Sequence, residues 1–146
     1  MTMTAGVTPK GEGIEGIAWD ILGQTYVPKQ LCENSFSWHA TFPAGTFVPP
    51  HIHPTQDEFI YVLGGRFDLF LDGSEAVANA GDFIRLPMGQ AHGIFNKTDS
   101  DVTCLFWVTP SRKLYDLFNK IDRLTDPEEV VRISADHEVN FLPPPD

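Results

Sequence analysis

The sequence predicts an all-β fold followed by one or two short helices near the C-terminus. Short apolar runs alternate with turn residues along most of the chain, and the turns recur about every eight to twelve residues. Twelve Gly and twelve Pro among 146 residues suit strands joined by turns and are too many for a helical bundle. This spacing is typical of an antiparallel sandwich or barrel rather than of alternating strand–helix units.

A barrel is predicted at about 14–109, where runs of apolar or alternating residues read as strands. Asp72-Gly73 is a tight-turn signal between two of these runs. Residues 1–13 are small, polar and Gly-containing, and they are predicted to form a flexible arm. The predicted strands are 17–22, 25–31, 36–42, 47–50, 58–63, 66–71, 76–78, 82–86, 92–96 and 102–108.

A helical pattern replaces the strand pattern after Pro110. Apolar residues three and four apart predict a helix within 111–124, and Thr125 or Asp126 is expected to cap a second helix that runs to about residue 135. The tail at 139–142 is apolar and then meets three prolines, which should end regular structure. We therefore expect a single domain at 14–146, with a helical extension at about 111–146. The helical stripe consists of Leu114, Leu117, Phe118, Ile121 and Leu124.

The overall composition narrows the class of function. The formal net charge is -10 and no basic stripe occurs, so binding to nucleic acid is poorly supported. No apolar run approaches the roughly 18 residues of a membrane span, and the N-terminus lacks the pattern of a secretory signal, so a cytoplasmic protein is expected. Cys32 and Cys104 are expected to be reduced and mostly buried thiols.

Three histidines and a glutamate near the middle of the chain predict a metal site. His51 and His53 are two residues apart, so on a strand both imidazoles project from the same face. Glu58 and His92 add a carboxylate and a third imidazole, and these groups hold first-row transition metals in proteins. Such a mixed set accepts one divalent ion of Fe, Mn, Ni, Co, Cu or Zn, and it does not select among them.

The spacing around these residues resembles both signature motifs of the cupin superfamily. The resemblance implies a small β-barrel or jelly roll, in which His51, His53, Glu58 and His92 together bind one metal. Only 15 residues, 66–80, separate the two motifs, as in compact single-domain bacterial cupins. The first motif is matched by Gly45, His51, His53, Glu58 and Gly65, and the second by Gly81, Pro87, Gly89, His92 and Asn96.

A second resemblance concerns the activity. The stretch at 47–53, the Val-Thr-Pro exit from the last barrel strand and the Val-Asn-Phe-Leu-Pro-Pro ending are similar to small bacterial cupins related to quercetin 2,3-dioxygenase. This implies a dioxygenase that uses dioxygen and acts on a small enolic or phenolic, conceivably flavonol-like, substrate. Glu58 would then be the catalytic proton acceptor. The alternatives are a non-oxidative lyase, isomerase or polyketide-type cyclase that uses the metal as a Lewis acid, and a ligand-binding cupin without turnover.

The motifs do not contain the residues that choose the substrate, which are expected in the barrel lining and the C-terminal helices. Gln56 could orient a substrate or replace a ligand, but a polar loop residue is more often solvated. His39 faces either the pocket or the surface, and strand alternation alone does not decide which. Trp38 and Trp107 would suit an aromatic substrate, although most large aromatic side chains in a small barrel belong to its core.

The last predicted barrel strand is apolar on both faces. Cys104, Phe106 and Val108 share one face, whereas Leu105 and Trp107 share the other. One face should fill the barrel, so the other is expected to pack against the C-terminal helices or a second subunit. We therefore expect a homodimer.

Overall fold

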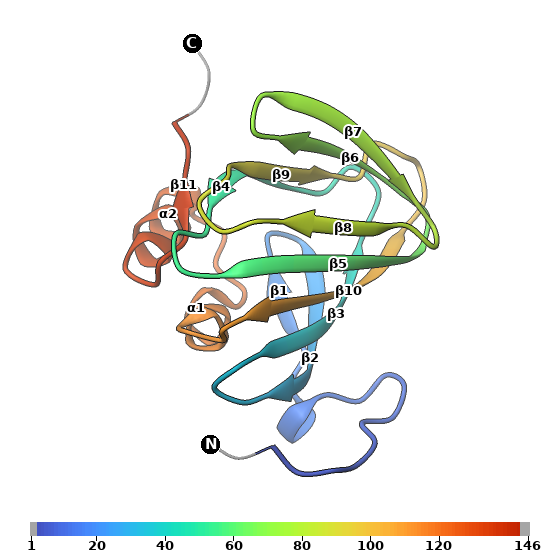
Figure 1. The fold of residues 1–146 in the computed structure, drawn as a ribbon, viewed down its shortest axis with the longest axis vertical. Coiled ribbons are helices and arrows are strands. Elements are labelled where there is room, and N and C mark those ends of the chain that lie inside the picture. Colours follow the sequence, from blue (N-terminus) through green and yellow to red (C-terminus); the bar gives the residue numbers. More distant parts are fainter. Residues whose placement is uncertain (1–2, 144–146) are drawn as a thin grey trace.

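Two antiparallel sheets face each other and form the barrel in a computed structural model that describes residues 3–143 (Figure 1). The six-stranded sheet has the order β1-β2-β3-β10-β5-β8, and the five-stranded sheet has the order β11-β4-β9-β6-β7. The strands are β1 (Trp19–Ile21), β2 (Gln24–Leu31), β3 (Phe36–Phe42), β4 (Phe47–Ile52), β5 (Asp57–Gly64), β6 (Arg66–Leu71), β7 (Ser74–Asn79), β8 (Phe83–Leu86), β9 (His92–Phe95), β10 (Val102–Thr109) and β11 (Asn140–Phe141). The predicted all-β jelly roll with C-terminal helices is confirmed.

Each predicted strand is present, with ends that differ by a few residues. The first begins at Trp19 instead of residue 17, and the strand predicted at 76–78 extends over Ser74–Asn79. Two elements were not predicted, the single 3-10 turn η1 (Ile14–Gly16) and the short strand β11. Neither contains enough residues to show a periodic pattern.

The core lies between the two sheets and consists largely of aromatic side chains. Residues on β3 and β10 alternate strictly between buried and partly exposed, as strand geometry requires. Trp38 on β3 stacks on Phe106 of β10, with ring centroids 5.0 Å apart. Cys32 and Cys104 are both free thiols, of which Cys104 is buried, so the expectation for the cysteines is confirmed except that Cys32 is only partly buried.

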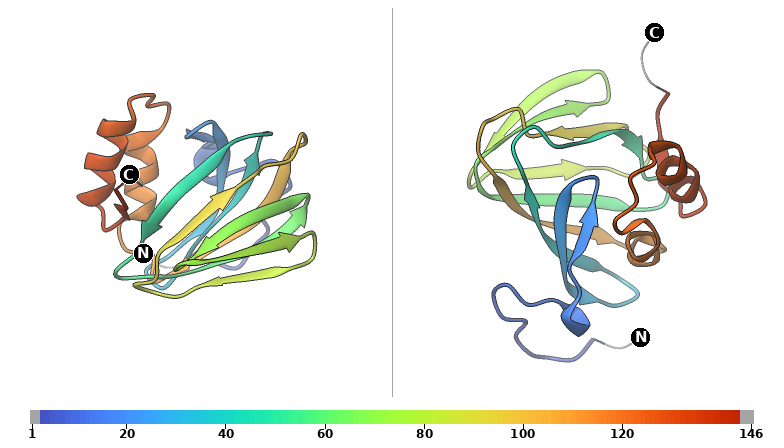
Figure 2. Two further views of the ribbon diagram at one scale, coloured as in Figure 1. Left: turned by 90° about the horizontal axis from the view of Figure 1, so that it is seen from above. Right: turned by 180° about the vertical axis from the view of Figure 1, so that it is seen from behind.

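Two helices pack together against one end of the barrel, where they form a cap (Figure 2). Helix α1 (Leu114–Ile121) is shorter than the predicted range of 111–124, because Arg112 and Arg123 adopt left-handed backbone angles, with φ of 47° and 66°, that interrupt the helix. Helix α2 (Pro127–Ala135) ends where it was predicted to end. Asp126 is its cap and accepts a hydrogen bond of 3.0 Å from the backbone N–H of Glu128.

The chain returns to the barrel after α2 and adds β11 to the edge of the five-stranded sheet. Asn140 lies opposite Ile52, and Phe141 lies opposite His51. The N–H of Leu142 then donates to the carbonyl of Pro50 over 3.0 Å. The tail is therefore anchored beside a predicted metal ligand. Of the prolines predicted to end regular structure, those at 144–145 lie outside the described residues, as does residue 146.

The N-terminal segment runs along β2. Lys29 donates hydrogen bonds to the carbonyls of Pro9 and Glu12, at 3.0 and 2.6 Å, and Thr8 donates to the carbonyl of Lys29. Residues 1–2 of the predicted arm lie outside the described residues, and the flexibility of the arm stays a prediction. None of the helices in residues 3–143 is long and apolar enough to cross a membrane.

Candidate metal centre

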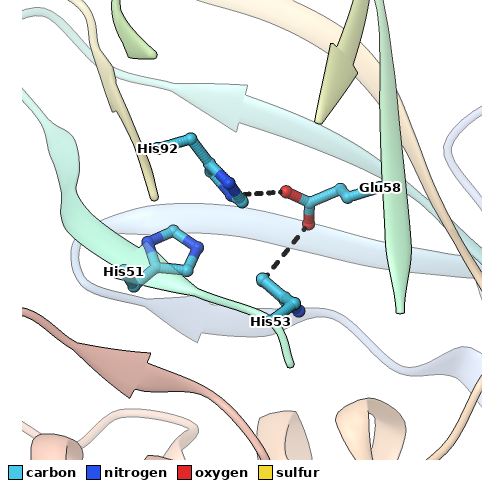
Figure 3. Close-up of side chains that lie close together, drawn as sticks. All are labelled: His51, His53, Glu58 and His92. Carbon is cyan, nitrogen blue, oxygen red and sulfur yellow. Dashed lines mark ion pairs between the residues drawn. The ribbon is translucent and has the colours of Figure 1, made fainter. Parts of the chain in front are cut away.

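The four predicted ligands meet at one point inside the barrel, at the end nearest the helices (Figure 3). His51 comes from β4, His53 follows that strand, Glu58 lies on β5 and His92 begins β9. One candidate ligand atom from each side chain lies within 4.8 Å of all the others, and no residue of the four is more than 4% exposed. The group could hold a metal ion.

Strand pairing and one loop contact produce this convergence. His51 lies directly opposite His92 across β4 and β9, and their ring centroids are 4.3 Å apart. The loop before β9 is fastened to the first motif by two backbone donors. The N–H of Gly89 donates to the carbonyl of His53 over 3.0 Å, and the N–H of Met88 donates to the Asp57 carboxylate over 2.8 Å. His92 is thereby delivered to the same face as the other ligands.

Gln56 fixes the orientation of His53 from outside the group. Its Nε2 donates to the carbonyls of Pro110 and Ser111, at 2.9 and 3.0 Å, so its Oε1 is the atom that remains to face the imidazole. His53 Nδ1 lies 2.8 Å from that oxygen and must carry the proton, because an amide oxygen can only accept. The lone pair of His53 Nε2 is therefore free for a metal.

His51 is oriented in the same way by the backbone. Its Nδ1 lies 2.8 Å from the carbonyl oxygen of Pro49, which can only accept, so the proton is on Nδ1 and the lone pair is on Nε2. Burial lowers the pKa of His51 well below its ordinary value and lowers the pKa of His53 as well. Burial thus favours the neutral form of both imidazoles, which is the state that a metal requires.

Glu58 is held as a carboxylate at the centre of the group. Burial would raise its pKa, but the neighbouring imidazoles of His53 and His92 outweigh burial and lower it to about 2. One carboxylate oxygen lies 2.9 Å from His92 Nε2 and the other lies 3.8 Å from His53 Nε2 (Figure 3).

Two features of the four residues suit a bound transition metal: some of their buried polar atoms lack hydrogen bonds, and their donor atoms are of the right kind. Glu58 Oε2 and His92 Nε2 lie 2.9 Å apart without the alignment of a hydrogen bond, and His92 Nδ1 is also buried without a partner among the described residues. An unpaired buried carboxylate oxygen is costly, and coordination to a cation would satisfy it. Three imidazoles and a carboxylate are also the donor set expected for Fe, Mn, Co, Ni, Cu or Zn.

An apolar cavity of about 50 Å³ adjoins three of the four side chains, His51, His53 and Glu58. Its remaining wall comes from the barrel interior, from both helices and from the tail. Three of its members were not among the predicted site residues, namely Tyr26 on β2, Ser134 on α2 and Phe141 on β11. From strand and helix periodicity alone, Tyr26 and Ser134 would be predicted only to face the core.

The remaining candidate residues divide between the cavity and the outer surface. Trp38 is buried and borders the cavity, whereas Trp107 lies on the outer face of the barrel against Phe59, with ring centroids 5.5 Å apart. His39 also faces outward, since Trp38 and Ala40 on either side of it are the buried residues of β3. Gln56 is buried, and it contacts a predicted ligand rather than the cavity.

Comparison with known proteins gives a consistent picture of the fold. A family model described as a cupin domain matches residues 38–108. Polyketide synthase CurC from Streptomyces cyaneus is 29% identical over 77 residues, which cover 53% of this chain and 50% of that protein. This chain thus spans about half the length of that curated relative.

Two solved structures share the fold at low sequence identity. KdgF from Halomonas sp. superposes with a TM-score of 0.68 at 21% identity, covering 77% of this chain and 99% of that chain. An RmlC-like cupin from Shewanella frigidimarina NCIMB 400 gives a TM-score of 0.68 at 20% identity, covering 79% of this chain and 99% of that chain. At this level of identity the likeness describes the fold alone.

Proposed function

From a domain match and structural neighbours that together support the cupin superfamily, we propose that this chain is a metal-dependent enzyme acting on a small enolic or phenolic compound. One observation carries the proposal. Four buried side chains of the kinds that bind metals lie together beside an apolar cavity. Apolar pockets that contain a few convergent polar groups are the usual sites of small-molecule chemistry.

His51, His53, Glu58 and His92 are the residues that would hold the metal. A divalent transition ion bound there would supply a Lewis acid for an enol or phenol oxygen. The apolar wall keeps water away from this oxygen, and among residues 3–143 Glu58 is the only carboxylate that borders the cavity. We assign to Glu58 the role of proton acceptor, because its carboxylate borders the cavity in which the substrate oxygen would lie.

The reaction that we propose is dioxygenation, in line with the resemblance to quercetin 2,3-dioxygenase-like cupins. Both atoms of dioxygen enter the substrate in such a reaction, so no external reductant is needed. The cavity of about 50 Å³ is much smaller than the roughly 300–1,000 Å³ of typical ligand pockets. A flavonol would therefore require side chains of α1 and α2 to move outward, and a smaller enol fits this site better.

A non-oxidative conversion of the same kind of substrate is the second candidate. It is favoured by the similarity to CurC, which is named a polyketide synthase, because polyketides contain enolisable ketones and phenols. A lyase, isomerase or cyclase of this class would use the same ligands and the same proton acceptor. A cupin that binds its ligand without turnover is the third reading.

Dioxygen uptake separates these readings. Metal-loaded protein is mixed with acetylacetone, a small stable enol, or with quercetin, and dioxygen and substrate are followed together. We expect equimolar loss of both with acetylacetone, and a fall in rate of at least about 100-fold for Glu58→Gln at equal metal content. Conversion under nitrogen would refute dioxygenation and support the second candidate, whereas binding without conversion would support the third.

We also propose a homodimer, formed through the outer face of the six-stranded sheet. Apolar side chains gather there beside Trp107, which contacts Phe59 and Phe83 with ring centroids 5.5 Å apart in each case. The outer face of β10 was expected to pack against either the C-terminal helices or a second subunit. The helices cap the end of the barrel instead, so we propose that a second subunit covers this face. The apolar face consists of Phe59, Tyr61, Leu63, Phe83, Leu105 and Trp107.

A cytoplasmic location stays a prediction.

Charge placed on this face should separate the subunits. Leu63 and Phe83 are 53% and 48% exposed, so Leu63→Lys and Phe83→Lys should leave the fold intact while placing like charges at the contact. Light scattering is expected to give the mass of a dimer for the wild type and of a monomer for the double variant. Val77→Lys, at a residue 49% exposed on β7 of the other sheet, is the matched control. A monomeric wild type would refute the proposal.

A further inference from the structure

Two buried polar atoms at the wall of the cavity have no hydrogen-bond partner among residues 3–143. They are the hydroxyl Oγ of Ser134 on α2 and the indole Nε1 of Trp38 on β3. Each side chain is only 1% exposed. Most buried polar groups are paired in folded proteins, because an unpaired group gives up its bonds to water without replacement. Two unpaired groups at one cavity indicate that something entering the cavity pairs with them.

Comparable groups nearby are satisfied by the protein itself. The hydroxyl of Tyr26, which also borders the cavity, donates to Gln24 Oε1 over 2.9 Å. The indole N–H of Trp19 donates to Asn119 Oδ1 over 3.0 Å. The chain thus provides acceptors for two comparable buried aromatic donors, one of them at the same cavity. Outside the metal centre, the unpaired buried side chains that border this cavity among the described residues are Ser134 and Trp38.

Ser134 also departs from the pattern of its own helix. The buried positions of α2 are Val130 and Ser134, one helical turn apart, and both border the cavity. An apolar residue would suit the second position as well as valine suits the first. A helical serine can donate to the carbonyl four residues before it, but Ser134 Oγ makes no such bond. A polar residue that lacks both a packing reason and a partner is characteristic of a functional position.

The charges around the cavity limit what this partner can be. The ionisable side chains that border it are Tyr26, His51, His53 and Glu58, and no Lys or Arg is among the described residues of the wall. A carboxylate or phosphate on the ligand would therefore meet no side-chain cation away from the metal centre. An indole N–H can only donate, so the group that it meets is an acceptor. A neutral oxygen satisfies both conditions.

We propose that Ser134 and Trp38 are substrate-binding residues that donate hydrogen bonds to a second, neutral oxygen of the substrate. The inference rests on the proposed function, because the first oxygen is assigned to the metal centre. It narrows the substrate class to small uncharged compounds that carry an enol or phenol together with a ketone, ether or further hydroxyl. Compounds whose second polar group is a carboxylate or a phosphate are excluded from this class.

A pair of nearly isosteric phenols tests the proposal by binding alone. 4-Methoxyphenol has an ether oxygen where 4-ethylphenol has a methylene group, so their affinities for metal-loaded protein differ only through that atom. We expect the wild type to prefer 4-methoxyphenol by about 5- to 10-fold, the worth of one or two neutral hydrogen bonds. Ser134→Ala and Trp38→Phe, which keeps the aromatic ring, should each reduce this preference while leaving the affinity for 4-ethylphenol within about twofold.

Thermal unfolding of the ligand-free protein separates recognition from a structural role. Ser134→Ala removes a group without a partner, so its Tm should equal or exceed that of the wild type. Ile133→Ala, on the same helix but outside the cavity wall, is the control and should lower the Tm without changing the preference. A lower Tm for Ser134→Ala with an unchanged preference would overturn the inference, as would a wild type that binds the two phenols equally or not at all. If only the proposed function is wrong, the preference survives and turnover is absent.

Discussion

Replacing His92 by Ala is expected to reduce the metal content of the purified protein from roughly one ion per chain to less than about a tenth. The variant loses one of four donors and also leaves the Glu58 carboxylate without the imidazole that lies 2.9 Å from it. His51→Ala should have a similar effect, because it removes a donor whose Nε2 is already free for a metal. Elemental analysis gives the content, and competition with a chromophoric chelator for Zn²⁺ gives the affinity.

Two further variants should give an intermediate loss of metal affinity and no loss, respectively. Gln56→Leu removes the acceptor that fixes the proton of His53 on Nδ1, so the affinity for Zn²⁺ should fall by about 10- to 100-fold while the ligand set stays complete. His39→Ala removes an outward-facing histidine and should leave metal binding unchanged. Full metal occupancy in both His51→Ala and His92→Ala would show that these residues do not form a metal site.

The second large effect concerns stability and the last glycine of the first motif. Gly65 has a φ of +88°, and a Cβ at this position would lie 2.9 Å from Val102 Cγ2 and 3.0 Å from the carbonyl oxygen of Asp101. Gly65→Ala therefore combines a left-handed backbone angle, at about 1–2 kcal/mol, with a steric clash, at about 1–3 kcal/mol. We expect a loss of about 3 kcal/mol in the free energy of unfolding, measured with urea on metal-free protein.

Gly81 provides the matched control for this prediction. Its φ is +91°, but nothing lies within 4 Å of a Cβ built on it, so Gly81→Ala carries only the backbone term of about 1–2 kcal/mol. The difference between the two variants isolates the close approach of Gly65 to β10. Equal losses for both variants would show that the neighbouring backbone moves aside without cost.

The sequence could predict the candidate site because its residues are fixed by spacing. The histidines, the glutamate and the surrounding glycines and prolines match the spacing of the cupin motifs at every position. The prediction that His51 and His53 share one strand face was wrong in detail, because β4 ends at Ile52 and His53 lies just beyond it. The connection from Gln56 through the carbonyls of Pro110 and Ser111 could not be predicted. It joins two segments that are far apart in sequence, and it depends on how the chain leaves β10.

The strands of the fold were predictable for a related reason. Alternation on β3 and β10 reflects one buried and one outer face, and this pattern is local. The ends of α1 were not predictable, because the apolar stripe continues past the point where Arg123 turns to a φ of 66°. Strand β11 has two residues, and only its pairing with β4 makes it a strand. Both misses depend on tertiary contacts that override a local signal.

The position of the cap relative to the cupin domain has an evolutionary consequence. The family match ends at residue 108, before α1, α2 and β11 begin. All four predicted ligands precede that boundary, whereas Ser134 and Phe141 follow it. If Ser134 contacts the substrate as proposed, mutations after residue 108 change which molecules are accepted without altering any of the four predicted ligands. Selectivity and metal binding would then be encoded in two separate, contiguous stretches of the chain.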